Sequence, residues 1–177
     1  PTMDSKIVLD KIASYTRNAR VTRDAVISDE IKAEEGRIVA VRIHGHKTTY
    51  NTLEDVNGRM IRLDEGDIVA GVLGSRRALL GYTGIVPDAI RVGEKLDILN
   101  LGGVVGKCTS VNLELGAPFQ AEVLGAVLSF PWIGERKGIP ATIRDNAVPW
   151  AEKLEKSAPI VYVSGTCMEA GKTFACG

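Results

Sequence analysis

The stretch RIVAVRI, residues 37–43, alternates in a way that decides the fold. One face of an extended chain would carry Ile38, Ala40 and Arg42, and the other face would carry Val39, Val41 and Ile43. Side chains that alternate between faces indicate a β-strand, and β-branched residues favour it. From Gly36 to about Leu128 similar short runs recur, separated by turn residues. This spacing predicts a mainly β domain over residues 36–130.

The segment TLEDVNGRMIRL, residues 52–63, predicts a hairpin within this domain. Asn57 and Gly58 suit the two positive-φ positions of a type I′ turn. No long helix separates the strands, so parallel βαβ units are not expected, and a closed sheet removes the exposed edges. The sequence therefore predicts a small antiparallel β-barrel, with one short helix at Arg76 to Leu80.

Other patterns flank this region. From Ser5 to about Arg17, apolar residues fall on one helical stripe, so residues 1–35 are expected to form an N-terminal helix and an arm. Whether residues 21–36 are helical or extended stays open. Residues 131–158 are interpreted as a Pro-rich connector, because prolines interrupt strands and helices, with a short helical piece at 150–157.

Composition excludes several classes of protein. The chain has 22 Lys and Arg residues and 22 Asp and Glu residues, so its formal net charge is zero. No overall electrostatic field therefore attracts it to nucleic acid or to an anionic membrane. The three cysteines lie in no CxxC pattern, which suggests free thiols in a reducing cytoplasm. No signal-peptide order or long apolar run is present. We therefore expect a cytoplasmic protein without a membrane segment.

The stretch PIVYVSGTCMEAGKTFACG, residues 159–177, resembles the start of a nucleotide-binding domain. Residues 160–164 are apolar on both faces, as in a covered parallel strand. A glycine-rich loop after such a strand, opening a helix, is the setting of a phosphate-binding P-loop. Gly165 and Gly171 would let the backbone N–H groups point inward, Lys172 would contact phosphates, and Thr173 would bind Mg²⁺.

The loop has five residues between Gly165 and the Gly171-Lys172 pair, one more than the usual P-loop. This longer form resembles the loop of dethiobiotin synthetase and of the cobyrinic acid amidating synthetases. The resemblance covers residues 159–177 and implies the first strand and P-loop of an α/β NTPase domain that binds ATP and Mg²⁺. It assigns nucleotide binding to Gly165, Thr166, Gly171, Lys172 and Thr173. ParA/MinD-type ATPases have lysine where Thr166 stands, and Cys167 replaces an acidic residue frequent in the synthetases.

These observations lead to two hypotheses for function. In the first, the barrel is an N-terminal accessory or substrate-presenting domain of an ATP-dependent, synthetase-like enzyme with an unknown small-molecule substrate. The P-loop domain is expected to be truncated, so the chain would be catalytically inactive and bind nucleotide weakly at most. In the second, the barrel is an oligomerisation or ligand-binding module and the P-loop is a regulatory nucleotide switch. The barrel or strand 160–164 could then form a homo-oligomer.

Other motifs are given structural interpretations. Residues 102–110, GGVVGKCTS, fit a strand with a bulge or tight turn better than a second phosphate loop. His44 and His46 are interpreted as an exposed strand end, and Asp64, Glu65 and Asp67 as a turn. Three basic groups could bind an anion or oligonucleotide if the fold gathered them on one face, but solvated charge is preferred and nucleic acid is not expected. They are Arg17, Arg20 and Arg23; Arg76 and Arg77; and Arg136 and Lys137.

Overall fold

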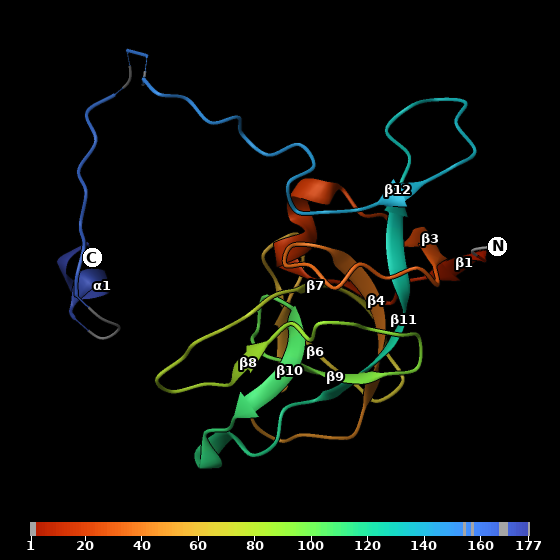
Figure 1. Ribbon diagram of the computed structural model, residues 1–177. Helices are drawn as coiled ribbons and strands as arrows, with labels where there is room; N and C mark the ends of the chain where they lie inside the picture. The colour runs from red at the N-terminus through yellow and green to blue at the C-terminus, as the bar shows by residue number, and fades with distance from the viewer. Residues whose placement is uncertain (1–2, 154, 157, 167–169, 177) are drawn as a thin grey trace. The chain divides into compact units, whose positions relative to one another are not determined.

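A computed structural model describes residues 3–153, 155–156, 158–166 and 170–176. The chain divides into two units, Pro1–Ala147 and Val148–Gly177, and each is described by itself. The first unit is mainly β (Figure 1). Its elements, in chain order, are β1 (Asp4–Val8), β2 (Lys11–Ile12), the 3₁₀ helix η1 (Ser14–Ala19), β3 (Asp24–Ser28), β4 (Ile38–His44), β5 (Thr52–Glu54), β6 (Met60–Arg62), β7 (Ile68–Leu73), β8 (Thr83–Ile85), β9 (Lys95–Ile98), β10 (Val104–Ser110), the 3₁₀ helix η2 (Leu113–Leu115), β11 (Gln120–Ser129) and β12 (Ile139–Pro140).

The main sheet has the strand order β1-β3-β11-β4-β7-β10-β8. Because β9 pairs with both β10 and β11, the ladder through β11, β4, β7, β10 and β9 returns to its starting strand. Most pairs are antiparallel, as expected. Two are not, since β2 and β10 both run parallel to β7. The expectation of a wholly antiparallel sheet is therefore wrong: long connections bring β2 and β10 to β7 in the parallel direction.

Strand β4 lies at the centre of this sheet. It pairs with β11 on one edge and with β7 on the other. Val39, Val41 and Ile43 belong to the larger apolar core, whereas Ile38 and Ala40 belong to a second core on the opposite face. The predicted alternation at residues 37–43 is thus present, and both faces of the strand are covered.

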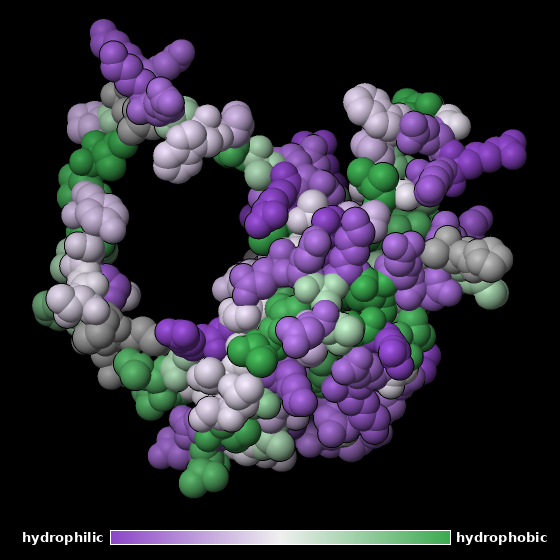
Figure 2. All heavy atoms as spheres, viewed as in Figure 1, coloured by the Kyte–Doolittle hydropathy of each residue, from purple (hydrophilic) through white to green (hydrophobic). Residues whose placement is uncertain are grey.

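Hydrophilic residues predominate on the face of the first unit that Figure 2 shows, with hydrophobic ones visible between them.

The predicted N-terminal helix at Ser5 to Arg17 is wrong. The segment forms β1 and β2 and only then the short η1 helix. All five residues of β1 pair with β3, which also settles the open question of residues 21–36 in favour of an extended strand at Asp24–Ser28. Leu9, between β1 and β2, is fully buried, and its N–H donates to the carbonyl of Arg23 at 2.8 Å. Pairing with β3 therefore outweighs the weak helical periodicity.

The hairpin at residues 52–63 is confirmed, because β5 pairs antiparallel with β6. Its turn differs from the predicted type I′ form. Gly58 has φ +77°, but Asn57 is not among the residues with positive φ. The Asp55 carboxylate instead accepts hydrogen bonds from the N–H groups of Asn57 and Arg59, at 2.8 and 2.9 Å. These bonds stabilise a turn that needs only one left-handed residue.

The short helix predicted at Arg76 to Leu80 is also absent. Arg76 and Gly84 instead exchange backbone hydrogen bonds of 2.9 and 3.0 Å, as an isolated antiparallel bridge. The Arg76 guanidinium donates to the carbonyl of Leu99. This bridge holds the start of the segment extended, so a helix cannot begin there.

The second unit contains little regular structure. Its described part includes one helix, α1 (Lys172–Ala175). Residues 150–153 and 155–156 are not helical, and residues 160–164 form no strand, so neither the short helix nor the covered strand is supported. Short helices and lone strands need a partner surface to be stable, and no α/β layer forms among these described residues. Within the described part of the chain, no helix has the length and apolar character needed to cross a membrane.

Candidate nucleotide-binding loop

The glycine-rich loop of the second unit leads directly into α1. Gly171 precedes the helix with φ +80° and ψ 9°, in the left-handed region that favours glycine. The N–H of Ala175 donates to the carbonyl of Gly171 at 3.0 Å, which closes the first helical turn. The helix therefore begins at Lys172, where the P-loop interpretation requires it to begin.

Gly165 lies close to the other end of the same loop. A Cβ atom at this position would stand 2.8 Å from the Cβ of Ala170 and 3.1 Å from Cγ of Lys172. The first of these contacts is too short for a Cβ atom, so the close return of the loop depends on glycine. The structure thus brings together Gly165, Ala170 and the stem of Lys172.

The remaining predicted loop residues differ in their surroundings. Thr166 and Thr173 are exposed, and Lys172 is partly buried. Residues 167–169, including Cys167, lie outside the described residues. The described residues of the loop are therefore its two ends, residues 165–166 and 170–173.

The two histidines of the first unit do not share a site. His44 Nε2 lies 2.7 Å from Oε2 of Glu122, and His46 Nε2 lies 2.9 Å from Oε2 of Glu65. Each ring thus has its own carboxylate partner. The hydrogen bond from His44 is the main reason that the pKa of Glu122 is lowered. Among the described residues, no three His, Cys, Asp or Glu side chains form a group that could hold a metal ion.

The acidic segment at residues 64–67 is a turn, as predicted. The N–H of Asp67 donates to the carbonyl of Asp64 at 3.2 Å, and the Asp67 carboxylate accepts from the N–H of Asp64 at 2.6 Å. Asp67 also pairs with Lys11 of β2. The Asp67 carboxylate therefore closes the turn and fastens β2 to the start of β7.

Residues 102–110 are a turn followed by a strand, also as predicted. Residues 104–110 of this segment are β10, whose pairing with β8 shifts register between Cys108 and Ser110. Gly103 has φ +90° and its carbonyl accepts from the N–H of Val72 at 2.9 Å. The glycines therefore serve chain reversal and close strand packing.

Two polar clusters were not found from the sequence. Lys47 Nζ donates to the carbonyl of Leu115 at 2.8 Å and lies 3.2 Å from the Tyr82 hydroxyl; burial lowers the pKa of Lys47 and raises that of Tyr82. Asp97 accepts from the N–H of Cys108 at 2.8 Å, and burial raises the pKa of both side chains. The first cluster joins residues 35 and 68 positions apart in sequence, and the second joins two paired strands, β9 and β10, so neither forms a contiguous motif. They fasten loops and strands within the first unit.

Comparisons of the chain with models of protein families, with curated proteins and with solved structures found no match.

Proposed function

We propose that residues 165–173 bind the phosphate groups of ATP together with Mg²⁺. The observation that carries this proposal is the geometry of the loop ends: a left-handed Gly171 starts a helix at Lys172, and Gly165 lies against the Lys172 stem. A loop that curls in this way can direct backbone N–H groups toward an anion. Lys172 would supply positive charge to the phosphates and Thr173 a hydroxyl ligand for Mg²⁺.

The proposal extends to the first unit. We interpret the closed circuit of five strands as a small β-barrel, which would be an accessory or substrate-presenting domain of an ATP-dependent, synthetase-like enzyme. The resemblance of the loop to the dethiobiotin and cobyrinic acid synthetases supports this class. A small-molecule substrate and a cytoplasmic location belong to the same proposal.

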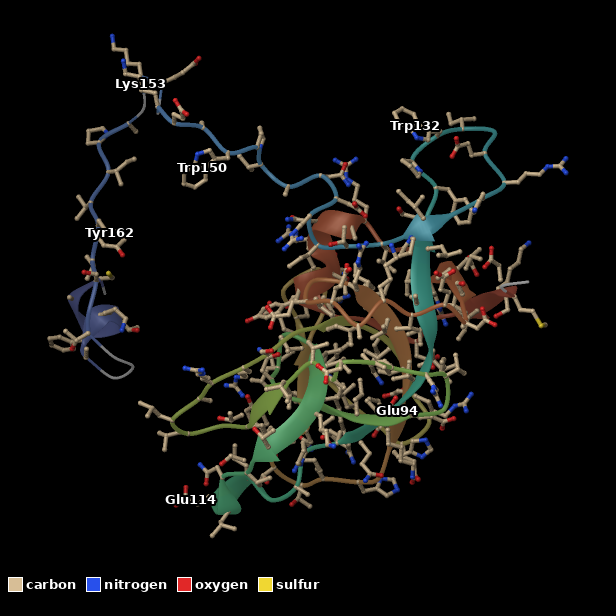
Figure 3. The ribbon with its side chains drawn as sticks, viewed as in Figure 1. Glu94, Glu114, Trp132, Trp150, Lys153 and Tyr162 are labelled. Carbon is tan, nitrogen blue, oxygen red and sulfur yellow. The ribbon has the colours of Figure 1, made fainter. Side chains whose placement is uncertain are left out.

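Titration of the 177-residue chain with Mg²⁺-ATP tests the nucleotide site. We expect weak binding, because α1 has four residues, none of them buried, and the described residues of the second unit form no apolar core to hold the loop. Lys172→Ala should abolish this binding. Lys153→Ala, which changes an exposed lysine elsewhere in the second unit, should leave it unchanged (Figure 3). Equal affinity of the Lys172→Ala variant and the unaltered chain would refute the assignment.

A second candidate function is self-association controlled by nucleotide. It is favoured by the exposure of three neighbouring apolar side chains, Ile160, Val161 and Tyr162, which are 70%, 88% and 85% accessible. Contiguous exposed apolar residues indicate an interaction surface. Light scattering with and without Mg²⁺-ATP tests this idea, with Val161→Asp as the variant that should prevent assembly. A particle mass that does not respond to nucleotide would rule out the switch.

A further inference from the structure

A groove of about 620 Å³ lies on the first unit. It lies between β3 and β11, beyond the two residue pairs that join these strands. One wall comes from residues 19–26, which lead from η1 into β3, and the other from residues 127–131 at the end of β11. Ala25 and Ala141, buried members of the second core, belong to its lining. Sites that enclose a small molecule have volumes of about 300–1,000 Å³, so the groove has room for large side chains.

The loop that connects β11 to β12 begins and ends at this groove. Phe130 and Pro131 at its start and Ile139 at its end belong to the lining. Ser129 and Ile139 form an antiparallel pair, which closes the base of the loop. Residues 131–137 are exposed, and the loop extends away from the sheet (Figure 1). The first unit therefore carries a projection directly beside a recess.

The tip of this loop is a turn that displays two large apolar side chains. The N–H of Glu135 donates to the carbonyl of Trp132 at 3.4 Å, and Gly134, at the third position of the turn, has φ +94°. Glycine suits a positive φ at this position. Ile133 is fully exposed and Trp132 is 67% exposed, on the outer part of the loop (Figure 3). Neighbouring apolar side chains in such a position indicate an interaction surface, and tryptophan is frequent at the centre of such surfaces.

The loop and the groove carry opposite charge. The loop has two cations and one carboxylate, which are Arg136, Lys137 and Glu135. The lining has one cation and two carboxylates, which are Arg20, Asp24 and Asp145. Within the described residues, none of these six side chains forms an ion pair. The loop of one molecule and the groove of another are therefore complementary in charge.

A second copy of the chain is the occupant that fits these observations. Trp132 and Ile133 are not part of the lining, so the loop does not fill the groove of its own chain. Because the projection and the recess are neighbours, a two-fold rotation can place the loop of each copy at the groove of the other. The same contact is then made twice, which doubles the apolar area and the charge pairs that it contributes.

We propose that the chain forms a symmetric dimer in which each copy inserts the loop at residues 131–138 into the groove of the other. Trp132 and Ile133 would cover the apolar part of the lining, and the two cations of the loop would lie near Asp24 and Asp145. The contact uses no residue of the nucleotide-binding loop or of the exposed apolar stretch before it. It is therefore independent of the function proposed above.

Sedimentation equilibrium of the 177-residue chain without nucleotide tests the dimer. The mass should rise from one chain to two as the concentration increases. Ile133→Asp should raise the dissociation constant about tenfold or more, because it removes an apolar contact and places a carboxylate near two others. Leu113→Asp, at a 93% exposed leucine of η2 outside the lining, is the matched control and should dimerise like the unaltered chain. Val161→Asp should also leave this dimer intact, which separates it from self-association through the second unit.

Exchange of charges tests the complementarity. Arg136→Glu combined with Lys137→Glu should weaken dimerisation, because the loop and the lining then both carry negative charge. Asp24→Lys, added to the same chain, should restore part of the affinity. All three positions are exposed, so the thermal midpoint of the monomer should not fall.

Fluorescence tests whether the loop itself is buried. The chain has two tryptophans, so Trp150→Phe leaves Trp132 as the only one. Its emission should move to shorter wavelength, and its quenching by acrylamide should fall, as the dimer forms.

Any of four results would overturn the proposal. They are a mass of one chain at every concentration, an unaltered dissociation constant in Ile133→Asp or in the charge-reversed loop variant, a dimer in which Trp132 stays as accessible to acrylamide as in the monomer, and a monomer that sediments with anionic phospholipid vesicles through Trp132. The last result would assign the loop to a membrane surface instead.

Discussion

Two stretches of this chain have similar apolar, β-branched sequences but differ in secondary structure and burial. Residues 38–43, IVAVRI, form a central strand whose first four side chains are fully buried. Residues 160–164, IVYVS, have equally high strand propensity, yet they form no strand and their apolar side chains stay exposed. The first stretch has a neighbouring strand on each edge and an apolar core on each face. Strand formation is therefore decided by partners more than by propensity.

The largest test of this contrast compares one apolar residue from each unit. Ile43→Ala removes a fully buried side chain from the larger core and should lower the free energy of unfolding of the first unit by about 3 kcal/mol. Tyr162→Ala removes an 85% exposed side chain of the second unit and should leave that transition unchanged (Figure 3). Urea denaturation of both variants checks the pair. A comparable loss in the two would show that residues 160–164 also stabilise the β fold.

A second test separates close packing from backbone strain within the first unit. Gly103→Ala would place a Cβ onto that of Ala13 at φ +90° and should cost about 2 kcal/mol or more. Gly58→Ala, at φ +77° with no atom within 4 Å of the new Cβ, should cost about 1 kcal/mol, from backbone strain alone. Thermal denaturation of the two variants gives the difference. Equal losses of stability in the two variants would mean that close packing around the turn before β10 adds nothing to the cost of backbone strain.

Asp97 provides a smaller, pH-dependent test of burial. Burial raises its pKa above the ordinary value of 3.8, so its protonated form is favoured in the folded state. Its contribution to stability is complete below that value and is lost as the pH rises through the folded pKa. Asp97→Asn keeps an acceptor for the N–H of Cys108 and should remove this dependence in denaturation measured from pH 3 upward. A variant with the same pH profile as the unaltered chain would contradict the assigned cause.

The smallest expected effect concerns Glu122, whose pKa is lowered mainly by His44. A lowered carboxylate pKa gives stability that is present above the ordinary value of 4.5 and lost as the pH falls through the folded pKa. Glu122→Gln should therefore flatten the acid side of the stability profile. Glu152→Gln, which changes an exposed carboxylate of the second unit, should not, and a matching response of both variants would count against the His44 pair.

Local patterns predicted those parts of the fold that have strong local causes. The alternation of Val39, Val41 and Ile43 and the turn at Gly58 are both visible in short windows of sequence. The helix expected from Ser5 to about Arg17 is wrong because residues 4–8 pair with β3, some twenty residues further along the chain. Parallel pairing of β10 with β7 is likewise set by contacts that no short window contains.

The candidate sites also divide into those that a contiguous motif predicts and those that only the fold brings together. Gly165, Gly171 and Lys172 could be selected from the sequence because a phosphate loop is a contiguous motif, and the helix does begin at Lys172. A groove lined by residues within 19–26, 127–131 and 139–146 could not be selected, because these segments are brought together only by the fold.

Strand β11 has a consequence for how the chain folds as it is synthesised. It pairs with four strands, β3, β4, β9 and β12. Two of these, β3 and β4, are synthesised before it and each has one other partner strand. Until residues 120–129 have left the ribosome, β3 and β4 each lack a neighbour and expose an adhesive edge. Nascent chains should therefore need protection by a chaperone over this interval, and synthesis that pauses shortly before Gln120 should increase their tendency to aggregate.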